Sequence, residues 1–402
     1  MGHWSMLVPL LLNCLATNAY TWSNETKEIP EYIVKHSPLV HLYSEELYYP
    51  GSIDQYVSRF MMSTADYNLT APLSLSNLTS SAKEVRDKVN DEKAELYLTS
   101  REQWQNEEGH EDWLTNYKTN KPNIWNGYIS NAYSTLIVVD KPDMDFVDAF
   151  WFYFYPYNLG PFVMGRGPFG DHLGDWEHSV VRFNRSSQEP LFLWMSAHGG
   201  GAGYTYESML DQNVLDPKRP AIYSARGTHA QYSSTGRHPH DIPYHMLSDF
   251  TDNGDLWDPS LNHVAYVLDE GSEVVYPANG TESGRELELG DWLLFDGHWG
   301  NKKLEPQDVR QQWSPFEWRI IDGPRGPLSK NLERKTVCER SKWWNLFKRC
   351  HIRQSITLGE GWDATGNKCE ILNEYTPAWL VPVTNLVTSG GWVCFGGDRM
   401  LA

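Results

Sequence analysis

Short runs of β-branched and aromatic residues, separated by clusters of Gly, Pro and Asn, fill the chain between residues 132 and 295. Such runs predict β-strands bounded by turns, and their spacing is typical of an antiparallel sandwich or barrel. The run at 150–155 is apolar at every position, which indicates a central strand buried on both faces. We therefore expect a mainly β fold with an antiparallel β-sandwich-like core. The expected strands lie at 136–139, 150–155, 180–183, 191–195, 221–223, 264–267, 274–276 and 292–295.

The sequence on either side of this core differs in character. Residues 52–55 (Ser-Ile-Asp-Gln) resemble a capping box that opens a short helix through Phe60, and residues 81–98 have the charge density of an exposed helix or a surface insertion. The last 65 residues contain all cysteines other than Cys14. The predicted organisation is a signal peptide at 1–19, a polar, helix-leaning region at 20–130, a β-rich core carrying the candidate metal site at 131–328, and a Cys-containing C-terminal lobe at 329–402.

The charge balance excludes several classes of partner. The 402 residues contain 34 Lys+Arg and 52 Asp+Glu, a formal net charge of −18. No basic field exists to collect phosphates, so a nucleic-acid partner is not expected. A polybasic attachment to anionic lipid is disfavoured for the same reason.

The N-terminus resembles a secretory signal. Residues 6–16 form an apolar run, and Thr17, Asn18 and Ala19 follow as the residues before a cleavage site. The run is too short for a membrane-spanning helix, and no later stretch reaches the roughly 18 apolar residues that such a helix needs. We expect no transmembrane segment and a mature chain in the secretory pathway, either lumenal or extracellular. An uncleaved apolar N-terminus is the alternative.

Two further features fit that compartment. Removal of the signal leaves an even number of cysteines near the C-terminus, which predicts two disulfides with three connectivities open; buried reduced thiols are the alternative. Sequons predict N-linked glycosylation, which would make the chain a glycoprotein. The cysteines are Cys338, Cys350, Cys369 and Cys394, and the acceptors are Asn24, Asn68, Asn77, Asn184 and Asn279.

The segment at 171–178 (Asp-His-Leu-Gly-Asp-Trp-Glu-His) contains three acidic residues and two histidines within eight positions. In an extended segment residues two apart share a face, so Asp175 and Glu177 are expected to point together. His172 lies upstream and completes a candidate cation site of mixed oxygen and nitrogen ligands. Such donors suit calcium, magnesium or manganese, with zinc also open. The alternative is a buried hydrogen-bond network that ties the strand to a neighbouring loop.

Histidines also stand near the ends of the next two expected strands. His198 precedes three glycines, and His229 follows the strand at 221–223. If these strand ends coincide, the two imidazoles converge with Asp175 and Glu177 on one site. His198 and His229 are then the candidate catalytic bases of a metal-dependent enzyme. No nucleophile signature supports a named reaction, so whether the protein is an enzyme stays open.

Two other polar clusters are candidates of lower specificity. His238, His240 and the acidic stretch at 249–255 could bind calcium, but they lack the spacing and closing Glu of an EF-hand. The segment at 291–298 combines Asp and His, which could join the main site or line a surface groove with aromatic residues.

The order of several motifs resembles the vacuolar protein sorting-associated protein 62 family of fungi. The resemblance covers roughly 36–328, and it implies a role in protein delivery to the vacuole without a settled biochemical activity. The motifs that carry it are residues 155–158 (Tyr-Pro-Tyr-Asn), 174–178 (Gly-Asp-Trp-Glu-His), 196–200 (Ser-Ala-His-Gly-Gly), 223–229 (Tyr-Ser-Ala-Arg-Gly-Thr-His) and 296–300 (Asp-Gly-His-Trp-Gly).

A more distant local similarity concerns the necrosis-inducing NPP-type proteins. It rests on His172, Asp175 and Glu177 followed by the motif at 196–200. That family is a β-sandwich that holds a divalent cation, which helps to engage the sugar head group of a sphingolipid. The resemblance implies that these three residues are metal ligands. The chain lacks the Gly-His-Arg-His start of that family's motif, so toxicity does not follow.

Three functions therefore compete. The first is a metal-binding lumenal glycoprotein of vacuolar protein sorting that recognises a hydroxyl-rich or anionic small ligand or a sorted protein. The second is a metal-dependent hydrolase or small-molecule tailoring enzyme at the same site. The third is a glycolipid-binding, cytolysin-like protein. The sequence leaves the ligand, the metal and the oligomeric state open.

Overall fold

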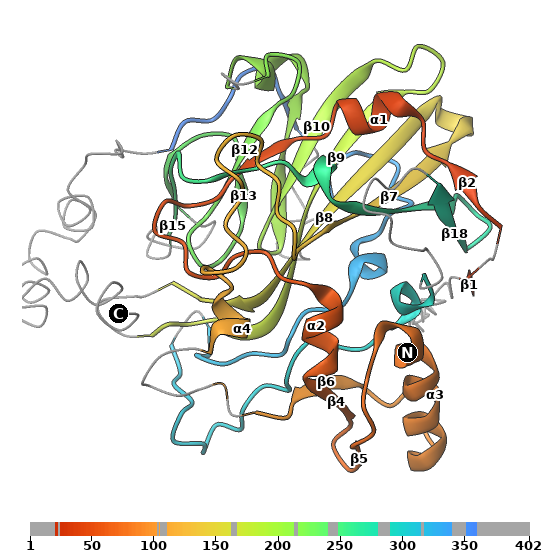
Figure 1. Cartoon of the computed structure of the whole chain (residues 1–402), viewed down its shortest axis with the longest axis vertical. Helices are drawn as coiled ribbons and strands as arrows, with labels where there is room; N and C mark the ends of the chain where they lie inside the picture. Colours follow the sequence, from red (N-terminus) through yellow and green to blue (C-terminus); the bar gives the residue numbers. More distant parts are fainter. Residues whose placement is uncertain are drawn as a thin grey trace, which may run out of the picture.

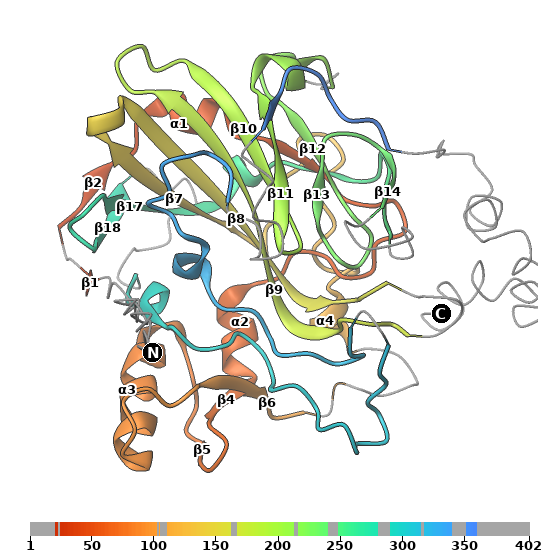
Figure 2. The same cartoon turned by 180° about the vertical axis from the view of Figure 1, so that it is seen from behind.

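A computed structural model describes residues 21–22, 25–102, 104, 111–161, 167–212, 216–239, 248–279, 290–314, 317–339 and 351–359. Its main feature is a 10-stranded sheet that runs through the centre of the protein (Figures 1 and 2). The strands of its main path, in spatial order, are β1 (Thr21–Trp22), β18 (Val274–Asn279), β17 (His263–Asp269), β7 (Ser134–Lys141), β8 (Phe146–Asn158), β9 (His172–Asn184), β10 (Pro190–Ala197), β11 (Gly200–Thr205) and β19 (Ile352–Arg353), and β2 (Lys27–Glu28) also pairs with β18.

The prediction of a mainly β fold is confirmed, and the strands from β7 through β11 pair antiparallel, as expected. The sheet is mixed beyond them, because β17 pairs with β7 in parallel. These two strands are far apart in the sequence, and the connection between them is long enough to bring the later strand back in the same direction.

Smaller sheets and short helices surround the central sheet. One small sheet consists of β13 (Gln231–Tyr232), β12 (Ala221–Ser224), β3 (Leu39–His41) and β16 (Leu256–Trp257), and β14 (Gly236–Pro239) pairs with β15 (Ser248–Thr251). The third consists of β5 (Asn68–Leu69), β4 (Phe60–Ser63) and β6 (Tyr97–Ser100). The α-helices are α1 (Glu31–Lys35), α2 (Ile53–Ser58), α3 (Leu78–Val89) and α4 (Asp112–Thr115), and 3₁₀ turns include η6 (Asp291–Leu294) and η7 (Pro327–Lys330).

Three local predictions need correction. The capping box does open α2, because the Ser52 hydroxyl accepts a hydrogen bond from the Gln55 amide, but the helix ends before Phe60, which begins β4. The helix expected at 81–98 is α3, which begins at Leu78 and ends at Val89, and β6 takes the end of that stretch. The strand expected at 292–295 is the turn η6, whose Trp292 and Leu293 are buried in the core without any strand partner in the described residues.

The two faces of the central sheet are buried in two separate cores. Alternate residues of β8, such as Phe152 and Phe154, face the core that includes α2, α3 and β4. The residues between them, such as Tyr153 and Tyr155, face the core that includes β3, β12 and β16. Both cartoon views place α2, α3 and the β4–β6 sheet on one side of the molecule and β12 and β13 on the other (Figures 1 and 2). The expectation that 150–155 is a central strand buried on both faces is confirmed.

A fully buried ionic cluster attaches the segment after η7 to the central sheet. Asp148 accepts hydrogen bonds from Lys141 (2.8 Å) and from two nitrogens of Arg182 (both 2.6 Å). The two cations also donate to backbone carbonyls of the segment, Lys141 to Leu332 (3.1 Å) and Arg182 to Lys335 (2.8 Å). The described part of the expected C-terminal lobe is thus packed on the central sheet, and it also contributes β19, which pairs with β11.

We expect Asp148→Asn to lower the free energy of unfolding by about 3–5 kcal/mol, because it leaves two buried cations without their counterion. Urea unfolding of the full chain measures this. The control is Asp140→Asn, which removes the partner of Arg185 in an exposed pair (2.7 Å) and should cost about 1 kcal/mol or less. Equal losses in the two variants would show that burial of the cluster does not set its contribution.

Candidate functional site

The candidate site lies on β9, where Asp175 and Glu177 point to the same face of the central sheet. In the register of the strand pair, Asp175 is opposite Tyr155 and Glu177 is opposite Tyr153. Both tyrosines belong to the core beneath the small β12-containing sheet, and both carboxylates are at least nine-tenths buried. The intervening Trp176 belongs to the opposite core. Strand alternation thus places two acidic side chains next to each other inside the protein.

Of the two carboxyl groups, Glu177 is the one whose pKa is clearly shifted. Burial, and then the negative charge of Asp175, raises the pKa of Glu177 to about 8. Ser196 on β10 donates a short hydrogen bond to the Glu177 carboxyl group, and its oxygen accepts one from the backbone amide of His178 (2.8 Å). Glu177 is therefore largely protonated at neutral pH, which lowers the cost of burying two carboxylates together.

His229 is the partner of Asp175. The turn between β12 and β13 holds His229 in the left-handed conformation (φ 56°). Its ring stacks on Tyr155 at 3.7 Å between centroids, with Nδ1 at 2.9 Å from Asp175 and Nε2 at 3.1 Å from the Tyr48 carbonyl. Because a carbonyl only accepts, Nε2 donates to Tyr48, and Nδ1 is left to hydrogen-bond with the Asp175 carboxyl group.

His198 lies at the exposed edge of the same site. It is also left-handed (φ 54°), and its side chain is 38% exposed. Nε2 is 2.6 Å from the buried carboxylate of Asp249, which also accepts from Thr228 (2.7 Å) and Tyr232 (2.6 Å). Burial by itself lowers the pKa of His198, but the charge and hydrogen bond of Asp249, and then Glu177, raise it to about 9. His198 is consequently an imidazolium at neutral pH.

His172 stands at the start of β9, where Gly174 (φ 66°) interrupts the strand alternation. A Cβ on Gly174 would lie 2.1 Å from the Trp299 carbonyl oxygen, so only glycine fits there. His172 Nδ1 donates to the Gly174 carbonyl (2.7 Å), which leaves Nε2 as the nitrogen available to a ligand. Burial lowers the pKa of His172 and keeps it neutral, although Asp175 opposes that shift.

The structure brings Asp175, Glu177, His198 and His229 together, and Asp249 joins them. We call these five residues the carboxylate–histidine cluster. Direct hydrogen bonds link the members to each other or to neighbours. Among the residues that the structure describes, no group of three or more His, Cys, Asp or Glu side chains is arranged to hold a metal ion.

Apart from Asp249, the other acidic and histidine-rich segments have partners outside this cluster. Asp296 pairs with Arg86 of α3 (2.9 Å), and His298 pairs with Glu95 (3.1 Å), so both lie with the helical side of the molecule. Asp252 accepts from Ser44 and not from the cluster. His238 bonds to Thr251 and stacks on Tyr232, whereas His240 lies outside the described residues.

The role of Asp249 is not visible in the sequence, because this residue is 51 positions from His198. Asp249 belongs to a separate acidic stretch, and the hairpin of β14 and β15 brings it to the cluster. Tyr155 and Ser196 belong to motifs of the sequence, but the sequence does not show them as neighbours of His229 and Glu177. The signal that could have found them is their position near the ends of the two predicted strands.

The predicted modification sites lie partly outside the described residues. Asn68 is exposed on β5, whereas the side-chain amides of Asn77 and Asn184 donate to Pro72 (3.0 Å) and Asp145 (2.9 Å). Cys338 is disulfide-bonded. The signal at 1–19, Asn24, the side chain of Asn279 and the cysteines Cys350, Cys369 and Cys394 lie outside the described part of the chain. Glycosylation and the expected pair of disulfides stay predictions.

The fold and the site define a mainly β protein whose central strand pair buries a carboxylate–histidine cluster. The sequence model of the family described as vacuolar protein sorting-associated protein 62 matches residues 8–240. The chain is 43% identical over 393 residues to vacuolar protein sorting-associated protein 62 of Saccharomyces cerevisiae, covering 91% of this chain and 81% of that protein. The chain belongs to the vacuolar protein sorting-associated protein 62 family.

A second relative and several solved structures are also similar. The putative vacuolar protein sorting-associated protein TDA6 of the same yeast is 40% identical over 416 residues, 96% of this chain and 86% of that protein. A structure of NLPPya in complex with mannosamine is 12% identical with a TM-score of 0.25, covering 62% of this chain and 82% of that chain. Necrosis and ethylene inducing protein 2 of the witches' broom pathogen of cocoa has the same TM-score at 13% identity, covering 63% and 83%. At these TM-scores the likeness carries no argument.

The raised pKa of Glu177 gives the site a pH signature. A buried carboxyl group with a raised pKa stabilises the fold fully below its ordinary value of 4.5, and this contribution is lost as the pH rises through about 8. Glu177→Gln stays neutral at every pH. The free energy of unfolding of this variant should therefore rise relative to that of the wild type as the pH increases from 4.5 to 8, by up to about 1.4 kcal/mol per pH unit.

Urea unfolding at several pH values between 4.5 and 8.5 measures this difference. Glu189→Gln removes an exposed carboxylate near the end of β9 and serves as the control. A constant difference between Glu177→Gln and the wild type across this range would contradict the raised pKa.

Proposed function

We propose that this protein acts in vacuolar protein sorting by recognising a hydroxyl-rich or anionic ligand at the carboxylate–histidine cluster. The compartment we propose is the lumen of the secretory pathway or of the vacuole. Membership of the vacuolar protein sorting-associated protein 62 family supports the sorting role. Among the described residues, no helix has the length and apolar character needed to cross a membrane.

The main support for a recognition site is that His198 is protonated and partly exposed. Its imidazolium is 38% exposed at the edge of an otherwise buried cluster, and Asp249 fixes its ring at 2.6 Å. A fixed, charged N–H donor suits a ligand hydroxyl or anionic oxygen. The same protonation argues against His198 as a general base, since a base must be unprotonated at the working pH. His229 is fully buried and bonded at both ring nitrogens, so it is also a poor base.

A yeast complementation experiment tests this proposal. Saccharomyces cerevisiae lacking both relatives described above should secrete part of a vacuolar hydrolase, and this chain should restore its delivery. His198→Asn, which tolerates the left-handed backbone but removes the imidazolium, should reduce restoration several-fold. His351→Ala changes an exposed histidine outside the cluster and should restore delivery like the wild type.

Two outcomes would contradict the proposal at different points. Normal hydrolase delivery in the strain without the relatives would remove the sorting role. Full restoration by His198→Asn at wild-type protein levels would remove the cluster from that role and leave the family inference intact.

A divalent cation is the second candidate, held by Asp175 and Glu177 with His172 as a third ligand. The donor chemistry favours it, because two buried carboxylates that repel each other can be neutralised by one hard cation. His172 donates Nδ1–H to a backbone carbonyl, an orientation that metal-binding histidines commonly use. Against it, the described residues form no ready three-ligand group. A bound cation would polarise ligand oxygens, while His198 would orient them.

We expect the purified chain to take up about one equivalent of calcium, magnesium, manganese or zinc, and Asp175→Asn/Glu177→Gln to lose it. Elemental analysis and calorimetric titration with each metal measure the uptake. The variant Asp140→Asn/Asp143→Asn removes two carboxylates at the end of β7 and in the turn after it, and it should bind like the wild type. No uptake by the wild type, or equal uptake by both variants, would leave the cluster as a hydrogen-bond network without a metal.

A further inference from the structure

The loop between α4 and β7 presents two large hydrophobic side chains almost fully to solvent. Ile124 is 83% exposed and Trp125 is 87% exposed, and Tyr128 of the same loop is 40% exposed. Exposing adjacent aliphatic and aromatic side chains is costly in water, and such a patch marks a contact with another surface. We call Ile124, Trp125 and Tyr128 the apolar tip.

Hydrogen bonds within the loop fix the position of this tip. The Asn123 carbonyl accepts from the Gly127 amide (2.7 Å), and the Asn123 amide donates to the Tyr128 carbonyl (2.9 Å). The Asn123 side chain accepts from the Trp125 amide (2.9 Å). Gly127 is left-handed (φ 77°), and a Cβ there would lie 2.8 Å from the Asp258 amide. The loop is therefore a closed turn built to project Ile124 and Trp125.

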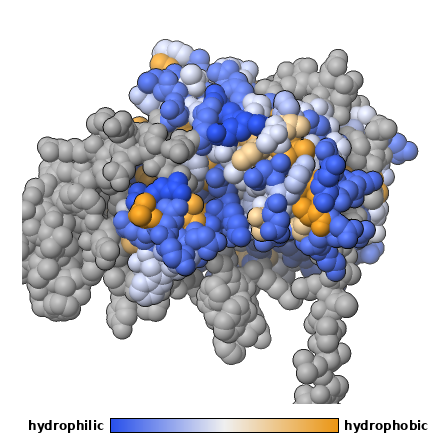
Figure 3. All heavy atoms as spheres, turned by 90° about the horizontal axis from the view of Figure 1, so that it is seen from below, coloured by the Kyte–Doolittle hydropathy of each residue, from blue (hydrophilic) through white to orange (hydrophobic). Residues whose placement is uncertain are grey.

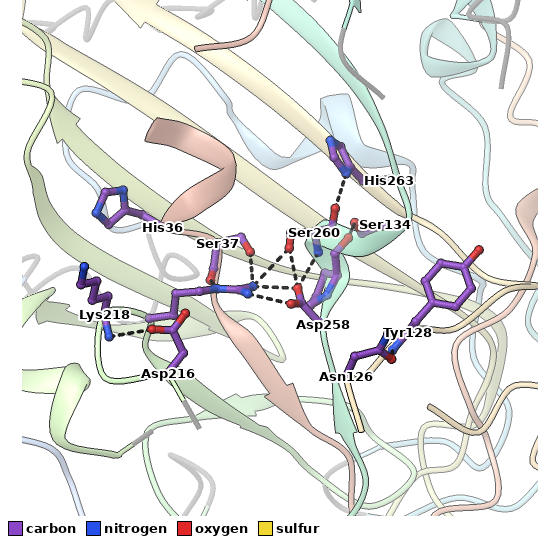
Figure 4. A network of polar contacts seen from close by, with 12 residues as sticks. His36, Ser37, Asn126, Tyr128, Ser134, Asp216, Lys218, Asp258, Ser260 and His263 are labelled. Carbon is purple, nitrogen blue, oxygen red and sulfur yellow. Dashed lines mark hydrogen bonds and ion pairs between the residues drawn. The ribbon is translucent and has the colours of Figure 1, made fainter. Parts of the chain in front are cut away.

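A buried ionic network anchors the loop to the body of the protein. The Asp258 amide donates to the Gly127 carbonyl (2.9 Å). Arg219 holds the Asp258 carboxylate through two hydrogen bonds (2.6 and 2.7 Å), and the Ser260 hydroxyl adds a third (2.6 Å). Figure 4 shows Asn126 and Tyr128 beside this network, which joins the small β3-containing sheet to the loop. The tip is thus mounted on a rigid base.

The two lysines in the segment that leads into the tip are paired with carboxylates, in contrast to the net charge of −18 for the whole chain. Lys118 pairs with Asp112 (3.0 Å), and Lys121 lies 3.8 Å from Asp255. Both lysine side chains are about three-fifths exposed. Because these charges are paired, they neither attract nor repel a lipid surface strongly. Binding to such a surface would then depend on burial of the apolar side chains.

We propose that the apolar tip inserts into the boundary between head groups and acyl chains of a zwitterionic lipid bilayer. Indole and phenol rings favour this boundary because one part of the ring is apolar and another donates hydrogen bonds. Three side chains on a projecting loop are too few for a stable protein interface, which needs about 800 Å² on each partner. On the face drawn in Figure 3, hydrophobic residues form only small separate patches among hydrophilic ones. The proposal is independent of the carboxylate–histidine cluster.

Flotation of the full chain with phosphatidylcholine vesicles tests the insertion. The wild type should float with the vesicles at low and high salt alike. Ile124→Ser/Trp125→Ser should lower the bound fraction about tenfold, since two apolar side chains no longer leave water. Trp313→Ser is the matched control, because Trp313 is another exposed tryptophan (63%) outside the loop, and its loss should change nothing.

Each other outcome overturns the proposal. Absence of the wild type from the floated fraction, or equal flotation of the double variant, removes lipid insertion at the tip. Binding only to vesicles with phosphatidylserine, abolished by salt, assigns the contact to charge. Thermal unfolding midpoints equal to the wild type show that the variants are folded; if the double variant unfolds earlier, Trp125→Ser alone takes its place.

Discussion

The pairing of β8 with β9 is the interaction on which the rest of the structure depends. The two long strands lie at the centre of the large sheet, and nearly every side chain on both faces is buried. Because side chains alternate along a strand, one register divides β9 between two cores. Trp176 packs with the helical side, while Asp175 and Glu177 face the small sheet. A shift of one residue would put the tryptophan among the polar groups and the carboxylates among the phenylalanines.

Two buried charge clusters in this sheet are satisfied to different degrees. Around Asp148, two cations neutralise the carboxylate, and their other N–H groups donate to backbone carbonyls of the chain after η7, which fastens that segment to the sheet. Glu177 lies near a second carboxylate, and in the described residues no lysine or arginine side chain hydrogen-bonds to Glu177. Protonation of Glu177 therefore removes the repulsion between the two carboxylates. Strongly perturbed carboxyl and imidazole groups at one site are typical of functional positions, and the Asp148 cluster is typical of architecture.

The sequence predicted strands best where hydrophobic runs were long and bounded by turn residues. The run at 150–155 lies in the buried strand β8, where both faces of the central sheet cover its side chains. The prediction was wrong at 292–295, where another apolar run (Trp-Leu-Leu-Phe) belongs to the turn η6 and the residue after it. Short apolar runs fit any buried backbone, and the packing of Trp292 in the tryptophan-rich core decides their conformation. The sequence predicted helices in the N-terminal region, but tertiary contacts determine where each helix begins and ends.

The sequence by itself determined that Asp175 and Glu177 share a face, because two-residue periodicity is a local property of an extended chain. It also determined the family, because the order of the motifs can be read directly along the sequence. Only the tertiary structure decided that Asp249 holds His198 and that Asp175 holds His229, pairs separated by 51 and 54 positions. Those contacts depend on which strand ends meet, and on two histidines in the left-handed conformation. No local pattern encodes them, because they arise from the packing of the small sheet against the large one.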